Sequence, residues 1–108
     1  MSNKAKIREL NDLLRTTGAG GRTVMTRGVQ AQGEEAVHEI LQKVRNYNRF
    51  HPDSDPYGEH DFGSFAYQGH EYFWKIDYYD STMELGSPDP ANPDVTKRVL
   101  TVMLAEEY

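Results

Sequence analysis

The acidic, histidine-containing middle of the chain carries the side chains best suited to chemistry. Carboxylates and imidazoles exchange protons near neutral pH, and they are also ligands that proteins offer to divalent cations. The candidates for catalysis or metal binding are Glu59, His60, Asp61, Asp77 and Asp80. Further groups of the same kind surround them, namely His51, Asp53, Asp55 and His70. These residue types allow acid–base catalysis or a hard-metal site, and they do not decide between the two.

The spacing of these groups matches no established metal-binding motif. Neighbouring residues on an extended strand point to opposite faces, so only Glu59 and Asp61 converge, and His60 faces away unless the loop turns. The chain lacks the His-Glu-x-x-His pattern of zinc proteases, and residues 53–55 only begin like a calcium-binding loop. Aspartates in such loops commonly accept hydrogen bonds from nearby backbone amides. We therefore expect no bound metal and no cofactor. Which of these residues, if any, are catalytic stays open.

The residues that follow predict a β-hairpin with two unlike faces. Two β-prone runs, 62–67 and 71–80, flank the turn at residues 68–70, and alternate residues of each run share a face. In the second run, the more apolar set, which should pack on a helix, is Tyr72, Trp74, Ile76 and Tyr78. The other set, which should be partly open to water, is Phe73, Lys75, Asp77 and Tyr79. Because exposed aromatic and charged groups suit a protein interface, the predicted binding residues are Tyr57, Lys75, Asp77 and Tyr79.

The composition narrows the classes of partner. The formal net charge is -5, and Lys75 is nearly alone among the acidic groups of the hairpin, so we expect no nucleic-acid partner. The chain has no cysteine, which excludes disulfides, cysteine-ligated zinc and a cysteine nucleophile. No apolar run approaches the ~20 residues that span a bilayer, and the start lacks the apolar stretch of a secretory signal. We therefore expect a cytoplasmic protein without a membrane partner.

The elements that must position these groups follow from hydrophobic spacing and backbone preference. Apolar residues at helical spacing predict helices over residues 3–16 and 34–47. Threonine and valine predict a strand over residues 22–30. The glycine-rich residues 18–21 end the first helix, and they are not a phosphate-binding loop because no Gly-Lys-Ser/Thr opens a helix after them.

Two proline-containing loops, 48–61 and 81–95, separate the hairpin from its neighbours, and a final strand is predicted over residues 96–105. The order α-β-α-β-β-β predicts an α+β fold in which two helices pack on a four-stranded, mainly antiparallel sheet. At 108 residues, the chain is expected to form a single α+β domain over residues 1–108. The strand order stays open, as does the choice between a monomer and a homodimer.

Several short segments of the sequence are distinctive when taken together. They are residues 55–63 (DPYGEHDFG), 74–80 (WKIDYYD), 86–90 (GSPDP) and 96–108 (TKRVLTVMLAEEY), with 10–12 (LND) and 26–29 (TRGV) before them. These phrases resemble the domain of unknown function 3768 family over nearly the whole chain. The resemblance implies a short bacterial protein, mostly alphaproteobacterial and often carried on plasmids or other mobile elements. It also implies a complete, cytoplasmic single domain, and it implies no activity, cofactor or catalytic residue.

The function we expect from these observations is a non-enzymatic module that binds or regulates another protein. Its setting would be a mobile element, where it would interact with the host or counteract the host's defences. The alternative is a small enzyme or metal-binding domain centred on the acidic, histidine-containing loop and the hairpin. The two differ in whether Glu59, His60 and Asp61 converge in a pocket or serve separate structural roles.

Overall fold

The computed structural model describes residues 3–108, and its two long helices lie where the apolar spacing predicts them. Helix α1 spans Asn3–Thr17 and helix α3 spans Glu34–Arg45. Each buries an apolar stripe against the sheet, with Leu14 and Ile40 among the residues excluded from solvent. Helix α3 ends at Arg45, whereas the prediction extended it to residue 47. Within the described residues, no helix combines the length and apolar composition needed to cross a membrane.

The strands form one mixed sheet of four strands, in the order β1-β4-β3-β2. Their bounds are Gly21–Met25 for β1, Phe62–Tyr67 for β2, His70–Tyr79 for β3 and Lys97–Leu104 for β4. Two 3-10 helices, η1 (Pro93–Val95) and η2 (Ala105–Glu107), flank β4. β3 pairs antiparallel with both of its neighbours, whereas β1 pairs parallel with β4. The predicted α+β class is therefore confirmed, and the sheet is antiparallel except at β1.

The segment predicted as one strand over residues 22–30 divides into strand β1 and helix α2, which spans Arg27–Gln30. Thr26 lies at the division and caps α2. The Glu107 carboxylate accepts hydrogen bonds from the Thr26 hydroxyl (2.6 Å) and from the Gly28 N–H (3.0 Å). The prediction was wrong here because local β preference carries no information about a carboxylate supplied by the other end of the chain. The described residues thus contain three α-helices instead of two.

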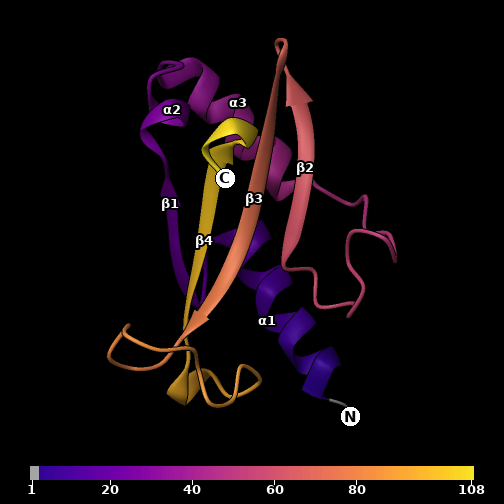
Figure 1. The fold of residues 1–108 in the computed structure, drawn as a ribbon, viewed down its shortest axis with the longest axis vertical. Helices are drawn as coiled ribbons and strands as arrows, with labels where there is room; N and C mark the ends of the chain where they lie inside the picture. The colour runs from indigo at the N-terminus through magenta and orange to yellow at the C-terminus, as the bar shows by residue number, and fades with distance from the viewer. Residues whose placement is uncertain (1–2) are drawn as a thin grey trace.

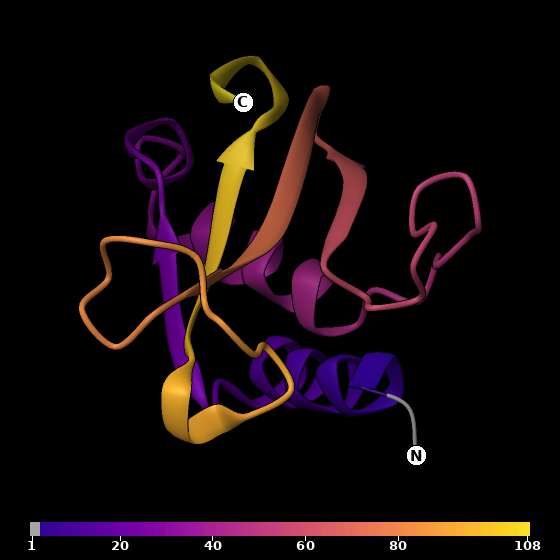
Figure 2. The same ribbon diagram turned by 60° about the horizontal axis from the view of Figure 1, so that its bottom comes forward.

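The helices cover only one face of the sheet. Figure 1 looks onto the sheet with α1 and α3 behind it, and Figure 2 shows the same separation from another side. The core between the layers joins helix residues to one set of alternating strand residues: Leu14, Val29, Ile40 and Val44 with Tyr72, Trp74, Ile76, Leu100, Val102 and Leu104. No α-helix within residues 3–108 packs on the opposite face. The predicted packing of the more apolar side of β3 on the helices is confirmed.

A buried arginine fixes α1 to α3. Arg15 is 6% exposed, and its Nη1 donates hydrogen bonds to the carbonyls of Val44 (3.2 Å), Arg45 (3.2 Å) and Tyr47 (2.9 Å). These carbonyls lie at the C-terminal end of α3, where the helix dipole favours a positive charge. The contact therefore sets the angle between the two helices and holds the start of the 48–61 loop near the sheet.

Candidate functional site

The sheet face without a helix, here called the open face, holds most of the predicted binding residues. Its side chains come from alternate positions that lie in register across all four strands. They are Arg22 and Val24 of β1; Lys97, Val99, Thr101 and Met103 of β4; Glu71, Phe73, Lys75, Asp77 and Tyr79 of β3; and Phe62, Ser64 and Ala66 of β2. Lys75, Asp77 and Tyr79 therefore share one surface, as the alternation along the second hairpin strand indicates.

A charged pair lies in the middle of the open face, next to an aromatic group. The Lys75 ammonium donates a hydrogen bond to the Asp77 carboxylate, so these two charges largely offset each other. Phe62 and Phe73 pack with their ring centroids 5.2 Å apart, and the exposed Tyr108 meets both rings edge-on. Large apolar side chains with few unpaired charges are typical of the central part of a protein interface.

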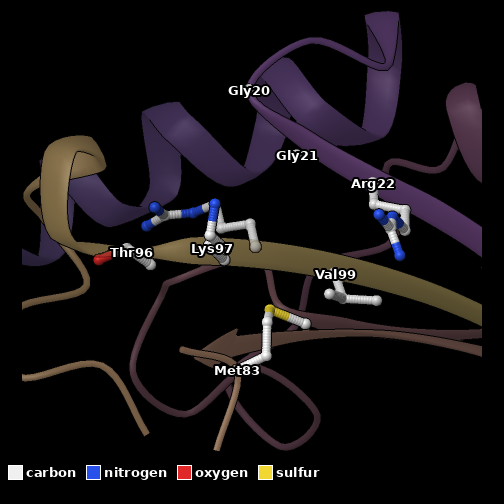
Figure 3. Close-up of a pocket in the computed structure, with 8 residues that line it drawn as sticks. Gly20, Gly21, Arg22, Met83, Thr96, Lys97 and Val99 are labelled. Carbon is white, nitrogen blue, oxygen red and sulfur yellow. The ribbon is translucent and has the colours of Figure 1, made fainter. Parts of the chain in front are cut away.

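A basic pocket lies at one end of the open face (Figure 3). It encloses about 450 Å³ and is lined by Gly21, Arg22, Met83, Lys97 and Val99, among others. Met83 belongs to the 81–95 loop, and Figure 3 shows its side chain directed toward β4 beside Val99. Neither Arg22 nor Lys97 forms an ion pair within residues 3–108. Both cations are therefore available to an anionic group that enters from solvent.

His60 turns away from its sequence neighbours and toward α1. Its φ of +56° is a left-handed conformation that is uncommon for a residue other than glycine, so strand alternation does not apply to this position. The ring Nδ1 lies 2.8 Å from Asp12 Oδ1, and Nε2 lies 3.8 Å from Asp55 Oδ2. The ring also stacks on Phe50 with a centroid distance of 3.6 Å. Asp55 is itself buried, and it accepts the backbone N–H groups of Glu59 (3.1 Å) and His60 (3.2 Å).

This arrangement attaches the 48–61 loop to α1 through one ring nitrogen of His60. Asp12 engages Nδ1 of His60, whereas Nε2 lies 3.8 Å from Asp55 Oδ2, beyond hydrogen-bond distance, and is the only ring nitrogen left to exchange a proton with a substrate. A shallow pocket of about 360 Å³ adjoins His60, and the exposed Tyr57 lines it. Tyr57 therefore lies on the 48–61 loop, apart from the other predicted binding residues on the open face.

Glu59 belongs to a separate polar network that crosses the core. The Tyr78 hydroxyl donates to Glu59 Oε1 (3.0 Å) and accepts from Asn11 Nδ2 (2.7 Å). Asn11, which is fully buried, accepts in turn from Arg98 Nε (2.9 Å) and donates to the Glu59 carbonyl (3.0 Å). Burial raises the pKa of the Tyr78 phenol, which keeps it a proton donor to Glu59. The network joins α1, β3, β4 and the 48–61 loop.

The remaining predicted catalytic residues make different contacts, although Asp61 lies near enough to Glu59 and Asp77 to be affected by their charges. Burial raises the pKa of the Asp61 carboxyl, and the charges of Glu59, Asp55 and Asp77 raise it further. Asp80 Oδ1 accepts hydrogen bonds from the Thr82 hydroxyl (2.8 Å) and backbone N–H groups of the following turn, and these bonds lower the pKa of Asp80. Asp77 bonds to Lys75, as described above. The structure thus distributes Glu59, His60, Asp61, Asp77 and Asp80 over several contacts and does not gather them into one pocket.

The outlying histidines and acids do not complete a metal site. The ion pair of His51 is with the neighbouring, exposed Asp53 (3.5 Å), and His70 is exposed next to the hairpin turn. Among residues 3–108, no three histidine or carboxylate side chains lie close enough together to hold a metal ion.

Sequence reasoning missed several residues that shape these sites. Arg22 and Lys97 come together only because β1 pairs with β4, and that pairing was not predicted. Asn11 could have been found, because it lies at helical spacing from Ile7 and Leu14 on the stripe that α1 buries. A polar residue on a buried stripe needs hydrogen-bond partners, and this need indicates a network.

Comparison with known proteins identifies a family. Residues 25–107 match the family described as Protein of unknown function (DUF3768). The matched range includes β2, β3, β4 and every predicted site residue from His51 to Asp80, and it begins after α1. No curated protein and no solved structure gives a significant match. The match confirms the resemblance indicated by the sequence phrases, and the chain belongs to the DUF3768 family.

Proposed function

We propose that this chain is a non-enzymatic protein-binding module with a regulatory role, and that its partner binds on the open face. The observation that carries the proposal is the one-sided covering of the sheet, which leaves the alternate side chains of four strands without a helix, although Met103 is buried and Tyr108 packs on Phe73. A sheet normally buries its apolar groups against another element, so apolar groups left uncovered mark a surface that a partner can cover. The exposed Val24 and the partly buried Val99 supply such groups.

The charges on the open face favour a partner with an acidic side chain near the basic pocket. Arg22 and Lys97 lie there without a counter-ion in the described residues, whereas Lys75 and Asp77 offset each other in the middle of the face. The whole chain carries a formal net charge of -5, so its other surfaces repel an acidic partner. A local positive site on an acidic protein therefore directs such a partner to one end of the open face.

We place this binding in the bacterial cytoplasm, on a host protein, with the chain acting as a mobile-element factor that counteracts host defence. The sequence phrases that resemble the family support the bacterial and mobile-element setting. The lack of cysteine fits a reducing compartment.

Site-specific photo-crosslinking in the native host tests the proposal. A photoreactive phenylalanine analogue replaces Tyr79 on the open face, and the matched control places it at Glu39, an exposed position on α3. The proposal predicts a discrete protein adduct from position 79 and none from position 39. Adding Lys97→Glu should abolish the adduct by reversing a charge of the basic pocket. Equal adducts from both positions, or no adduct from position 79, would contradict the proposal.

Thermal unfolding with added metal ions distinguishes this proposal from a metal-dependent enzyme. A metal that binds the native state raises Tm, because binding adds free energy to that state alone. The protein-binding proposal predicts no ion-specific shift for the wild type. A rise of about 5 °C with one divalent ion, lost in His60→Ala, would favour the metal site instead.

A further inference from the structure

We propose that the free edge of β2 is a strand-addition site that takes an extended, acidic segment of the partner protein. The inference rests on the proposed function and deepens it, because it names the form and chemistry of the bound segment. β2 is an outer strand of the sheet, and in Figure 1 no strand lies on its other side. An edge strand offers unpaired backbone donors and acceptors on which an extended peptide can add a strand.

The register shows which backbone groups of β2 are free. The Ile76 N–H donates to the Asp61 carbonyl (2.9 Å), so positions 61 and 76 form a hydrogen-bonded pair. Hydrogen-bonded pairs alternate along an antiparallel ladder, so Gly63 and Phe65 also bond to β3. Ser64 and Ala66 then direct their N–H and C=O groups away from β3. No hydrogen bond from outside the β2–β3 ladder reaches these groups within residues 3–108.

β2 lacks the features that usually protect an edge strand. It runs for 6 residues with neither a charged residue nor a proline. The opposite edge, β1, is shorter at 5 residues and includes Arg22. The side chain of Gln30 also donates to the Met25 carbonyl at the end of β1 (2.8 Å). Of the two edges, β2 is therefore the one open to another strand.

The groove along this edge is basic. A pocket of about 450 Å³ lies between β2 and the end of α3, and it is lined by Lys43, Tyr47, Arg49, Phe65 and Ala66, with two asparagines. No carboxylate lines it, and neither Lys43 nor Arg49 forms an ion pair within residues 3–108. These two cations favour a segment with acidic side chains. A second copy of this chain would instead bring its own Lys43 and Arg49 to the same edge.

The geometry also fixes the pattern of the bound segment. An added strand sends alternate side chains to opposite faces of the sheet. Side chains on the helix-covered side would meet Lys43 and Arg49, whereas those on the other side would extend the open face beside Phe62. The segment should therefore carry Asp or Glu at every second position, with apolar or β-branched residues between them.

Selection from a displayed library of random ten-residue peptides tests the inference. Peptides are selected on the wild-type chain, and their affinities are then measured by fluorescence anisotropy. We expect an excess of Asp and Glu with a period of two, and at least tenfold weaker binding to the Lys43→Glu, Arg49→Glu double variant. Changing the selected acids to lysine should restore binding to that double variant.

A pair of variants at one position isolates the backbone contribution. Ala66→Pro removes an outward N–H without removing a bond to β3, and it should weaken binding at least tenfold. Ala66→Val retains the N–H and should bind as the wild type does. Circular dichroism melting of both variants checks that the fold is retained, and the double charge variant tests the same site if Ala66→Pro unfolds.

The other outcomes overturn the inference in distinguishable ways. Selected peptides without an acidic pattern, or equal binding to Ala66→Pro and the wild type, would overturn it, as would a selection that enriches nothing. Peptides that lose binding to the Lys97→Glu variant but not to the Ala66→Pro variant would overturn the edge site and leave the open-face proposal standing.

A dimer detected by sedimentation and abolished by Ala66→Pro would overturn the inference by assigning the edge to a second copy of the chain. An edge-bound acidic peptide without a crosslink at position 79 would instead count against the open face.

Discussion

Neighbouring residues of β3 experience two different environments on the two sides of the sheet. Trp74 is fully buried among α1, α3 and the 48–61 loop, where its ring meets Tyr47 and Phe50 edge-on. Phe73 and Lys75, on either side of it in sequence, lie on the open face and are only partly buried. The polar groups differ in the same way. The buried Asn11 belongs to a network that spans the core, whereas Lys75 forms an isolated pair with Asp77 among the described residues.

This difference indicates that the two faces of the sheet have different roles, one in stability and one in binding. Side chains on the helix-covered face of the sheet, here called the covered face, supply most of the buried apolar area, and hence most of the stability. Most side chains on the open face, other than the buried Met103 and the partly buried Phe73, can change at little cost to the fold, which leaves them free to meet a partner. The carboxylates and His60 that most resemble a catalytic set hold the loop that borders the covered face.

The largest effect is expected when Trp74 is truncated. Trp74→Ala should lower the free energy of unfolding by about 4 kcal/mol, because a fully buried aromatic ring leaves a cavity. The same change at the neighbouring position, Phe73→Ala, should lower the free energy of unfolding by only about 1 to 2 kcal/mol, because the Phe73 ring is only partly buried. Urea unfolding followed by circular dichroism measures both. Equal losses would remove the contrast between the faces.

The next effect comes from adding a methyl group where β2 passes the core. A Cβ at Gly63 would lie 2.4 Å from Trp74 Nε1 and 2.7 Å from the Tyr47 ring, so Gly63→Ala should cost about 3 kcal/mol. Ser64→Ala, on the open face, is the matched control and should leave stability within about 0.5 kcal/mol of the wild type. The same unfolding measurement applies, and a tolerated Gly63→Ala would show that the covered face is loosely packed.

A moderate effect is expected from the polar network. Asn11→Ala removes the partner of Arg98 Nε and of the Glu59 carbonyl, and it should cost about 2 kcal/mol because buried polar groups lose their hydrogen bonds. Thermal unfolding measures the loss. A variant as stable as the wild type would indicate that water replaces the amide.

A smaller, pH-dependent effect should arise at the end of the chain. Hydrogen bonds from the Thr26 hydroxyl and from backbone N–H groups lower the pKa of Glu107 below its ordinary 4.5. Its stabilisation is therefore complete above pH 4.5 and is lost as the pH falls through the lowered pKa. Glu107→Gln should cost about 0.5 kcal/mol at pH 7, because water screens an exposed carboxylate. The difference should disappear in acid, and a constant difference across pH would contradict this assignment.

The smallest expected effect has the opposite sign. The pKa of Asp61 is raised from 3.8, chiefly by burial, so the folded state disfavours the charged carboxylate. Its cost is absent below pH 3.8 and develops as the pH rises through the raised pKa. Asp61→Asn should therefore raise Tm slightly at pH 7 and leave it unchanged in acid. Differential scanning calorimetry at both pH values measures this, and destabilisation at pH 7 would indicate that the carboxylate makes a favourable contact.

The sequence allowed the covered face to be predicted because its signals are local. Helical spacing identified α1 and α3, and alternation separated Trp74 from Lys75. The parts that escaped prediction depend on contacts between distant segments. Glu107 bonds to Thr26 and Gly28 where β1 gives way to α2, and Asp12 bonds to His60 where the 48–61 loop turns, a turn that the sequence left open. The basic pocket escaped for the same reason, since Arg22 and Lys97 meet only through the parallel pairing of β1 with β4.

The most direct test of the account measures stability and partner binding on the same two variants. Tyr79→Ala changes the open face, and Asn11→Ala changes α1 where it contacts the covered face through Tyr78. Each is assayed for its free energy of unfolding and for retention of the protein crosslinked from position 79 of the parent chain. We predict that Tyr79→Ala stays within about 1 kcal/mol of the wild type and loses the partner, whereas Asn11→Ala is less stable and retains it. Retention of the partner by Tyr79→Ala, at wild-type affinity, would contradict the account.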